Sequence, residues 1–252
     1  MRLKNKIAVI TGGNSGIGFA IAKAFKKEGA KGSIVGRNQK RLDTCIKELD
    51  LDFLALKGDV TNVLDLDNVF RQTINKFGKL DILVVNAGGA VGSATIGSVV
   101  DTSEEDYMQT IDLNLKSVFF TVQKALPYMK DGASIVLVSS IAADKAFSGM
   151  SVYSAAKAGV RSFARSFSAD LLERNIRVNV LTPGPTQTPL FNKMGLSDEV
   201  IEESKKGLEE MIPLKRLGTS QEMAKVAVFL ASDDSSFMLG EEIIVDGGVS
   251  NF

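Results

Sequence analysis

The chain has 252 residues, 44% of them hydrophobic, and its 30 basic and 30 acidic residues balance to zero net charge. It contains no histidine, which excludes Ser-His-Asp and Cys-His catalysis and histidine-ligated metal sites, so proton transfer must use Tyr, Lys, Asp, Glu, Cys or water. The balanced charge gives no reason to expect a nucleic-acid or anionic-membrane partner, and the single cysteine, Cys45, excludes an intrachain disulfide.

The single cysteine and the apolar pattern of the chain also indicate the cellular compartment. Cys45 stands in a helix-like stretch with no histidine to activate it, so we expect a structural cysteine in a reducing environment. No targeting segment precedes the first apolar run, and no apolar stretch approaches the roughly 20 residues that cross a bilayer. We therefore expect a cytoplasmic protein with no membrane partner and, since no cluster of ligands stands out, no metal.

Short β-branched apolar runs alternate with longer helix-like segments along the chain. The predicted strands are 7–10, 33–35, 53–57, 82–85, 134–138, 177–181 and 242–245. The predicted helices are 16–28, 39–49, 65–77, 104–129, 152–174 and 221–231. Apolar strands that alternate with helices predict an α/β fold, a Rossmann-like, doubly wound parallel sheet of about seven strands with helices on both faces. No linker or repeat interrupts the pattern, so we expect one domain over 1–252.

The first predicted strand runs directly into a glycine-rich turn that opens a helix. The turn reads Thr11-Gly12-Gly13-Asn14-Ser15-Gly16-Ile17-Gly18. Glycine allows the backbone to approach a pyrophosphate closely, and the helix N-terminus offers free N–H groups and the positive end of its dipole. The pattern indicates a dinucleotide site formed by Gly12, Asn14, Ser15, Gly16, Ile17 and Gly18. The alternative is an ordinary glycine-rich turn between a strand and a helix.

The end of the second predicted strand bears on which cofactor would bind. An acidic residue there would hold the adenosine ribose hydroxyls, but the chain has Gly36 followed by Arg37. Arg37 is suited to a charge-assisted contact with a 2′-phosphate, and Ser15 offers a hydroxyl donor. We therefore expect NADP(H) rather than NAD(H), the alternative being a solvated Arg37 that carries no information.

A candidate acid/base pair opens the predicted helix 152–174. A spacing of four residues places Tyr153 and Lys157 on one helix face, and a nearby ammonium should lower the phenol pKa from about 10. By itself this pair is often a surface coincidence. Thirteen residues before Tyr153, the predicted strand 134–138 ends at Ser139-Ser140, where a hydroxyl could bond a substrate oxygen or serve as a structural serine.

Taken in order and spacing, these motifs resemble the short-chain dehydrogenase/reductase family over nearly the whole chain. The resemblance implies that Tyr153 is the acid/base and that Lys157 lowers its pKa and binds the ribose hydroxyls. It implies that Ser140, rather than Ser139, positions the substrate oxygen. It also implies that Asn114 holds a water in a proton relay to Lys157.

Further matches lie at the ends of later predicted strands. By resemblance, the cofactor-binding residues include Asp59, Val60, Asn86, Ala87, Gly88, Pro183, Gly184, Thr186 and Thr188. Val85 departs from the family's Asn-Asn-Ala-Gly signature by replacing its first Asn, while Val245-Asp246-Gly247-Gly248 resembles the usual closing strand. The family also implies a homotetramer or homodimer, with segments 104–129 and 152–174 supplying an interface.

The implied activity is an NADP(H)-dependent oxidoreductase that interconverts a carbonyl and a secondary alcohol. A 3-oxoacyl thioester, a sugar, a steroid-like ketone and a small xenobiotic carbonyl all stay open as substrates. One alternative is a catalytically silent nucleotide-binding sensor or scaffold, and another is an epimerase or dehydratase on the same fold.

The segment 183–212 is long for a connection and is expected to be a substrate-binding loop or lid, with surface decoration as the alternative. Candidate pocket walls lie in 89–100, 142–151 and 190–211. They include Phe147, Met150, Leu190, Phe191 and Met194.

Overall fold

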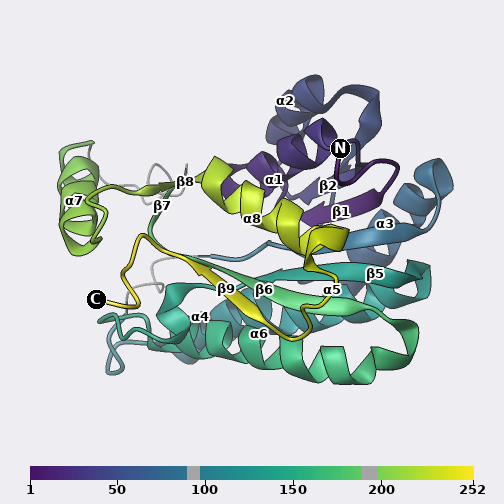
Figure 1. The fold of residues 1–252 in the computed structure, drawn as a ribbon. Helices are drawn as coiled ribbons and strands as arrows, with labels where there is room; N and C mark the ends of the chain where they lie inside the picture. Colours follow the sequence, from purple (N-terminus) through teal and green to yellow (C-terminus); the bar gives the residue numbers. More distant parts are fainter. Residues whose placement is uncertain (90–96, 189–197) are drawn as a thin grey trace.

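The computed structural model describes residues 1–89, 97–188 and 198–252. Seven strands form one parallel sheet in the order β3-β2-β1-β4-β5-β6-β9 (Figure 1). They are β1 Ile7–Thr11, β2 Lys31–Gly36, β3 Phe53–Lys57, β4 Leu80–Val85, β5 Met129–Val138, β6 Arg177–Pro183 and β9 Glu242–Val245. A second, two-stranded sheet joins β7 Thr186–Gln187 to β8 Gly218–Thr219. The predicted doubly wound α/β fold and its seven strands are therefore confirmed.

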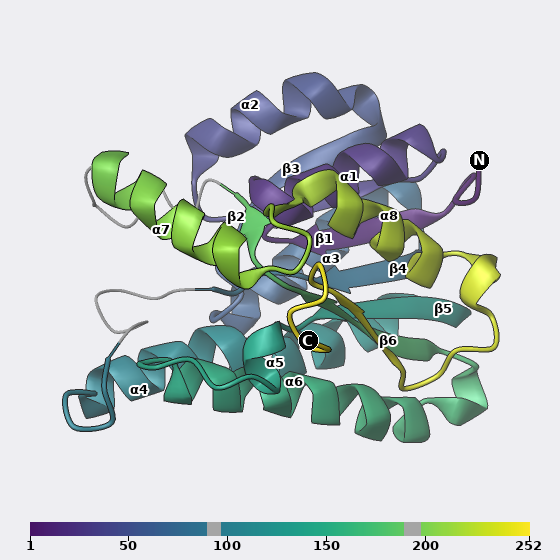
Figure 2. The same ribbon diagram turned by 60° about the vertical axis from the view of Figure 1, so that its left-hand side comes forward.

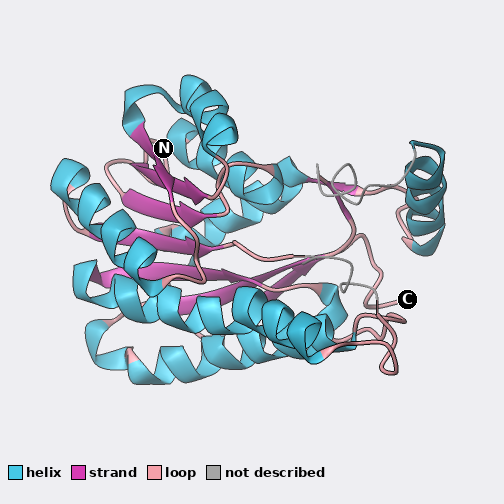
Figure 3. Cartoon of the chain, turned by 180° about the vertical axis from the view of Figure 1, so that it is seen from behind, coloured by secondary structure: helices cyan, strands magenta, loops and turns pink. Residues whose placement is uncertain are grey.

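Helices cover both faces of the large sheet (Figure 3). Their bounds are α1 Gly16–Lys27, α2 Gln39–Leu49, α3 Val63–Phe77, α4 Glu104–Ile111, α5 Ser117–Ala125, α6 Ser151–Asp170, α7 Asp198–Met211 and α8 Ser220–Ala231. One core lies between the sheet and α1, α2 and α8, and the other between the sheet and α3, α5 and α6. Cys45 is buried in the first of these cores. No helix in the described ranges is long and apolar enough to cross a membrane.

Strand β1 explains why the sheet needs cover on both sides. All five of its residues are buried. Side chains alternate along a strand, so Val9 enters one core while Ala8 and Ile10 enter the other. A strand buried on both faces reads as a continuous apolar run, which is the reason that its position was readable from the sequence.

The prediction of one continuous helix over 104–129 is wrong. Helix α4 ends at Ile111, a π-helical turn spans Asp112–Lys116, and α5 then ends at Ala125. Pro127 lies in the 3₁₀ turn Leu126–Tyr128 that follows, because proline cannot supply the N–H that a continuing helix needs. Met129, placed in the helix by the prediction, is instead the first residue of β5.

The strand order reverses direction between β1 and β4, so the turns that follow these strands flank a crevice at the carboxyl edge of the sheet. Helices α1, α2 and α8 gather on one side of this sheet and α4, α5 and α6 on the other (Figure 2). Helix α7 stands apart from both layers (Figure 1). The chain segments after β1, β4, β5 and β6 therefore meet at a single edge, where the candidate site lies.

Candidate active site

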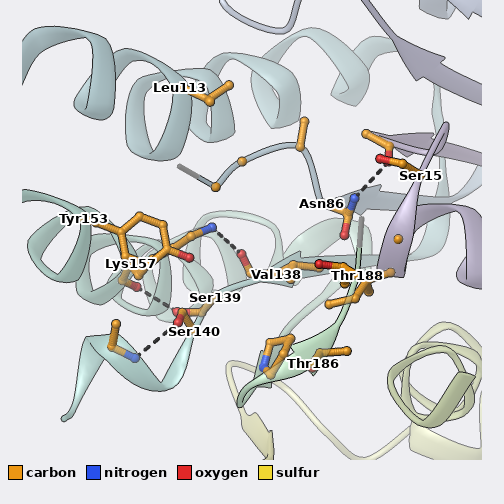
Figure 4. A pocket seen from close by; sticks show the side chains of 18 of the residues that line it. Ser15, Asn86, Leu113, Val138, Ser139, Ser140, Tyr153, Lys157, Thr186 and Thr188 are labelled. Carbon is orange, nitrogen blue, oxygen red and sulfur yellow. Dashed lines mark hydrogen bonds between the residues drawn. The ribbon is translucent and has the colours of Figure 1, made fainter. Parts of the chain in front are cut away.

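A cavity of about 510 Å³ lies at this edge (Figure 4). One end is lined by the glycine turn after β1 and the other by Ser140, Tyr153 and Lys157. Of the predicted site residues, all but Gly18 and Asn114 line it directly. The fold thus brings together residues that are far apart in the sequence, and the two exceptions lie immediately behind its wall.

The glycine turn is closely packed. Gly12 and Gly16 have φ angles of +64° and +52°, in the left-handed region that residues with a side chain rarely adopt. A Cβ built on Gly18 would lie only 2.4 Å from the Gly12 carbonyl oxygen, which explains the need for a third glycine. Ser15 begins α1 without capping it through its side chain, so the first-turn N–H groups are not satisfied by that hydroxyl.

Thr11 and Asn86 tie the turn after β1 to the turn after β4. The Thr11 hydroxyl oxygen accepts hydrogen bonds from the backbone N–H groups of Asn86 and Ala87, both at 3.1 Å. The Asn86 side-chain amide donates back to the Thr11 carbonyl oxygen at 3.0 Å. Asn86, predicted to contact the cofactor, lines the cavity, and its side-chain amide also joins the two turns. Thr11 was missed as a site residue, its one signal being a hydroxyl at the end of a buried apolar strand.

The adenosine end of the cavity contains Gly36, Arg37 and Asp59. A Cβ on Gly36 would lie 2.4 Å from the Asn14 side-chain nitrogen, so any larger residue here would have to displace the Asn14 side chain. Arg37 is 71% exposed, and its guanidinium lies 3.9 Å from an Asp59 carboxylate oxygen. The other Asp59 oxygen accepts bonds from Thr61 at 3.0 and 2.8 Å. Val60 lies beside them in the cavity wall.

Lys157 is buried one helical turn from Tyr153. Its ammonium donates to the carbonyl oxygen of Val138, the last residue of β5, at 3.0 Å. It lies 5.7 Å from the centre of the Tyr153 ring. Burial lowers the pKa of Lys157 to about 8, because the charged form is desolvated. The spacing therefore places the two groups together as predicted.

The pKa of Tyr153 shifts in the direction opposite to that expected. Burial raises it, since the phenolate is disfavoured away from water, and a hydrogen bond with the Ser140 hydroxyl acts in the lowering direction. The Lys157 ammonium faces the phenol ring and the Val138 carbonyl. In this structure the lowering influence on the phenol thus comes from the serine rather than from the lysine.

The two neighbouring serines do different things. Ser139 is buried, and its hydroxyl donates to the backbone carbonyl of Lys157 at 2.9 Å, which fastens the end of β5 to α6. The Ser140 hydroxyl oxygen accepts from the N–H of Ala142 at 3.2 Å and begins the 3₁₀ turn Ile141–Ala143. Ser140 is also the serine that acts to lower the pKa of Tyr153. Both serines line the cavity, and the choice of Ser140 over Ser139 as the residue that faces the substrate stays a prediction.

Asn114 lies in the π-helical turn and is fully buried. Its side-chain oxygen accepts from the Gly89 N–H at 2.8 Å, and its amide donates to the carbonyls of Gly89 and Thr110 at 3.1 Å. A Cβ on Gly88 would lie 2.9 Å from that oxygen and 3.1 Å from the Lys157 nitrogen. Asn114 thus holds the 88–89 turn directly beside Lys157, in a π-turn of the kind that often marks functional sites.

The segment after β6 closes the opposite wall. The N–H of Gly184 donates to the Val245 carbonyl at 2.9 Å, and the Thr186 hydroxyl donates to the Gly184 carbonyl at 2.9 Å. Pro183 and Thr188 also line the cavity. So do the predicted wall residues Phe147 and Met150, while Leu190, Phe191 and Met194 lie outside the described residues.

Comparison with known proteins places this architecture among named relatives. Residues 12–250 match a family described as enoyl-(acyl carrier protein) reductase. The chain is 40% identical to an oxidoreductase of Sarocladium schorii, over 99% of this chain and 97% of that protein. It is 37% identical to the 3-oxoacyl-acyl-carrier-protein reductase FabG of Thermotoga maritima, over 99% of both chains.

Solved structures agree with these sequence matches. A short-chain dehydrogenase/reductase of Brucella melitensis, titled glucose/ribitol dehydrogenase, superposes with a TM-score of 0.90 at 32% identity and 98% coverage of both chains. A short-chain dehydrogenase/reductase of Serratia marcescens gives a TM-score of 0.90 at 30% identity, covering 99% of this chain and 100% of that one.

Proposed function

The chain belongs to the short-chain dehydrogenase/reductase family, and from that membership we propose that it is an NADP(H)-dependent oxidoreductase that interconverts a carbonyl and a secondary alcohol. The observation that carries this proposal is that a single cavity, which begins at the glycine turn, is lined at its other end by Ser140, Tyr153 and the buried Lys157. A silent sensor would have no use for such a set of groups.

We propose that Tyr153 is the acid/base. In the reductive direction its hydroxyl proton passes to the carbonyl oxygen of the substrate, and Ser140 gives that oxygen a second hydrogen bond as negative charge develops on it. The bound nicotinamide would supply or accept the hydride at the substrate carbon. Lys157 keeps a positive charge beside the phenol and would bind the ribose hydroxyls, and Asn114 would hold the water of a proton relay to Lys157.

The residues present fit a dinucleotide. A Cβ on Gly12 would lie 2.8 Å from the Asn86 amide nitrogen, so only glycine lets the turn after β1 pack this closely against the turn after β4. The first-turn N–H groups of α1 would bind the pyrophosphate. The cavity of about 510 Å³ lies within the range of ligand sites. The residues proposed to hold the cofactor are Gly12, Asn14, Ser15, Gly16, Ile17, Gly18, Arg37, Asp59, Val60, Asn86, Ala87, Gly88, Pro183, Gly184, Thr186 and Thr188.

The preference for NADP(H) over NAD(H) rests on Gly36 and Arg37. The glycine removes the carboxylate that would repel a 2′-phosphate, and the exposed Arg37 can leave its 3.9 Å contact with Asp59 to pair with one. Ser15 adds a hydroxyl at the same end of the cavity. A higher kcat/KM with NADPH than with NADH is the expected result, and the reverse order would contradict the preference.

The substrate end of the cavity is mainly apolar among the described residues. Ile141, Phe147 and Met150 line it from the segment between β5 and α6, and Leu208 and Met211 line it from α7. We propose that 183–212 acts as the substrate-binding segment of a single-domain protein. These walls favour a carbonyl that carries an apolar group, such as a 3-oxoacyl thioester or a small ketone, over a free sugar.

We further propose that the protein is a cytoplasmic homotetramer or homodimer. Phe119 on α5 is 38% exposed, and it lies 5.8 Å from the ring centres of both Phe163 and Phe167 on α6. An exposed apolar aromatic group across two adjacent helices favours burial against a second copy. Size-exclusion chromatography with light scattering tests this, and a monomer at micromolar concentration would contradict it.

The activity itself is tested by following NADPH absorbance with acetophenone, acetoacetyl-coenzyme A and a pentose. Steady consumption with at least one carbonyl is expected. Tight NADPH binding without turnover of any of them would favour the silent-sensor alternative. Conversion of a carbonyl or alcohol with no net change in NADPH would favour an epimerase or dehydratase.

A further inference from the structure

A partly buried ion-pair network of Arg161, Asp144 and Glu242 lies next to the site and is not explained by the proposed chemistry. Arg161 follows Lys157 by one turn of α6 and Tyr153 by two, so it lies on nearly the same helix face. Its guanidinium pairs with Asp144 through one nitrogen and lies 2.5 Å from a Glu242 oxygen through another. The Arg161 side chain is 23% exposed and that of Glu242 is 16% exposed, so solvent screens this network less than a surface pair.

The partners of Arg161 belong to different segments of the active site. Asp144 directly follows the 3₁₀ turn Ile141–Ala143, which begins at Ser140. Glu242 is the first residue of β9, and its second carboxylate oxygen accepts a hydrogen bond from Thr182 on β6. Thr182 immediately precedes Pro183 and the wall of the cofactor cavity. The Arg161 guanidinium therefore links α6 to the Ser140 turn and to the start of β9, and Glu242 extends this link to the end of β6.

The way the guanidinium is held indicates what it is for. An arginine commonly binds one carboxylate through two parallel N–H···O hydrogen bonds. Arg161 instead reaches two carboxylates on different elements, and its Nε–H is buried without a hydrogen-bond partner among the described residues. A buried unpaired donor is unfavourable, so this arrangement is explained better by bridging the two segments than by the strongest single contact.

We propose that Arg161 is a positioning residue, which fixes the Ser140 turn against the catalytic helix by bridging Asp144 and Glu242. Loss of the bridge would free the far end of the 3₁₀ turn whose near end carries the Ser140 hydroxyl. The catalytic consequence rests on the proposed function, whereas the ordering of the turn can be measured without any substrate.

Two variants separate the bridge from the general stability of the fold. Arg161→Met removes the charge but keeps a long apolar stem, and Asp144→Asn removes only the contact to the turn. Asp144 is 44% exposed, so the second variant tests the bridge even where the first fails to fold. Arg165→Met, one turn further along α6, is the matched control because Arg165 is exposed and has no ion pair within the described residues.

The first readout is hydrogen exchange of the backbone amides over 141–147. We expect faster exchange there in both test variants, with exchange in α1 and β1 unchanged, and parent-like exchange in Arg165→Met. The second readout is catalysis with NADPH and whichever carbonyl the parent reduces best. We expect kcat to fall about ten- to a hundredfold while the KM for NADPH changes less than about twofold, because only the Ser140 side is displaced. Arg161→Lys should recover part of the loss by keeping one of the two pairs.

The third readout is the pH profile of alcohol oxidation, which should rise as Tyr153 loses its proton. Ser140 acts to lower the pKa of Tyr153, so loosening the turn should move the apparent pKa of this rise upward. Parent-like exchange over 141–147 in both test variants, or a parent-like kcat and pH profile in both, would overturn the proposal. An inactive parent would instead contradict the proposed function, and the exchange comparison would still decide the role of Arg161.

Discussion

Replacing Lys157 by methionine should make the protein's stability respond to pH in a defined way. Burial lowers the pKa of Lys157 from its ordinary 10.5 to about 8, and the lysine has no ion-pair partner among the described residues. Charging it in the folded protein therefore costs roughly 3 kcal/mol relative to charging it in the unfolded chain. Methionine fills a similar volume and carries no such cost.

The direction in which stability changes with pH follows from how many protons the folded and unfolded states bind. Below about pH 8 both states of the parent hold the proton, and the full cost of the buried charge is present. Between about pH 8 and about pH 10.5 the folded protein has released the proton while the unfolded chain still holds it, so the parent gains stability as pH rises. The free energy of unfolding of the parent minus that of Lys157→Met should increase by roughly 2–3 kcal/mol between about pH 7 and about pH 10.

Urea unfolding of both proteins across this range measures the difference, and groups common to both proteins cancel. The lost hydrogen bond to the Val138 carbonyl adds an offset of about 1 kcal/mol that does not depend on pH. Lys225→Met, at an exposed position on α8, should follow the parent throughout. A difference between parent and Lys157→Met that stays flat or decreases with pH would refute the argument that the ammonium is buried without an ion-pair partner among the described residues.

Three further substitutions test the site. Ser140→Ala should lower kcat about a hundredfold and raise the apparent pKa of alcohol oxidation, since it removes the bond that lowers the pKa of Tyr153; an unchanged pH profile would argue against that contact. Gly88→Ala places a Cβ 3.1 Å from the Lys157 nitrogen and should reduce kcat at least about tenfold, and an unchanged kcat would contradict the close packing of this turn against Lys157. Arg37→Gln should reduce kcat/KM about tenfold for NADPH and little for NADH, and an equal loss with both cofactors would contradict a contact with the 2′-phosphate.

Much of the fold was readable because parallel strands buried on both faces appear as apolar runs. The predicted strands 53–57 and 242–245 and the predicted helix 39–49 coincide with β3, β9 and α2, and the other strands differ at one or both ends by a few residues. Pro127 marks the end of the predicted helix 104–129 in the sequence, but the π-helical break at Asp112–Lys116 was not readable. It depends on Asn114, whose amide bonds the Thr110 carbonyl and the Gly89 backbone, and Gly89 lies in a turn 25 residues away.

The features of the site also divide into those that the sequence could predict and those that it could not. Tyr153 and Lys157 lie on one helix face, so their proximity follows from helical spacing alone. The bonds between Thr11 and Asn86 need the parallel pairing of β1 with β4, which no local pattern encodes. The pKa of Tyr153 was placed in the wrong direction because desolvation depends on the whole surrounding structure, whereas the sequence displayed only the neighbouring charge.

The central claim is that Tyr153 transfers the proton in a hydride-transfer reaction. Tyr153→Phe, compared with the parent in single-turnover reduction of the best carbonyl, tests it most directly, with NADPH binding measured by fluorescence on the same samples. The account predicts unchanged NADPH affinity and a reduction rate at least about a thousandfold lower. A parent-like rate in Tyr153→Phe would contradict it.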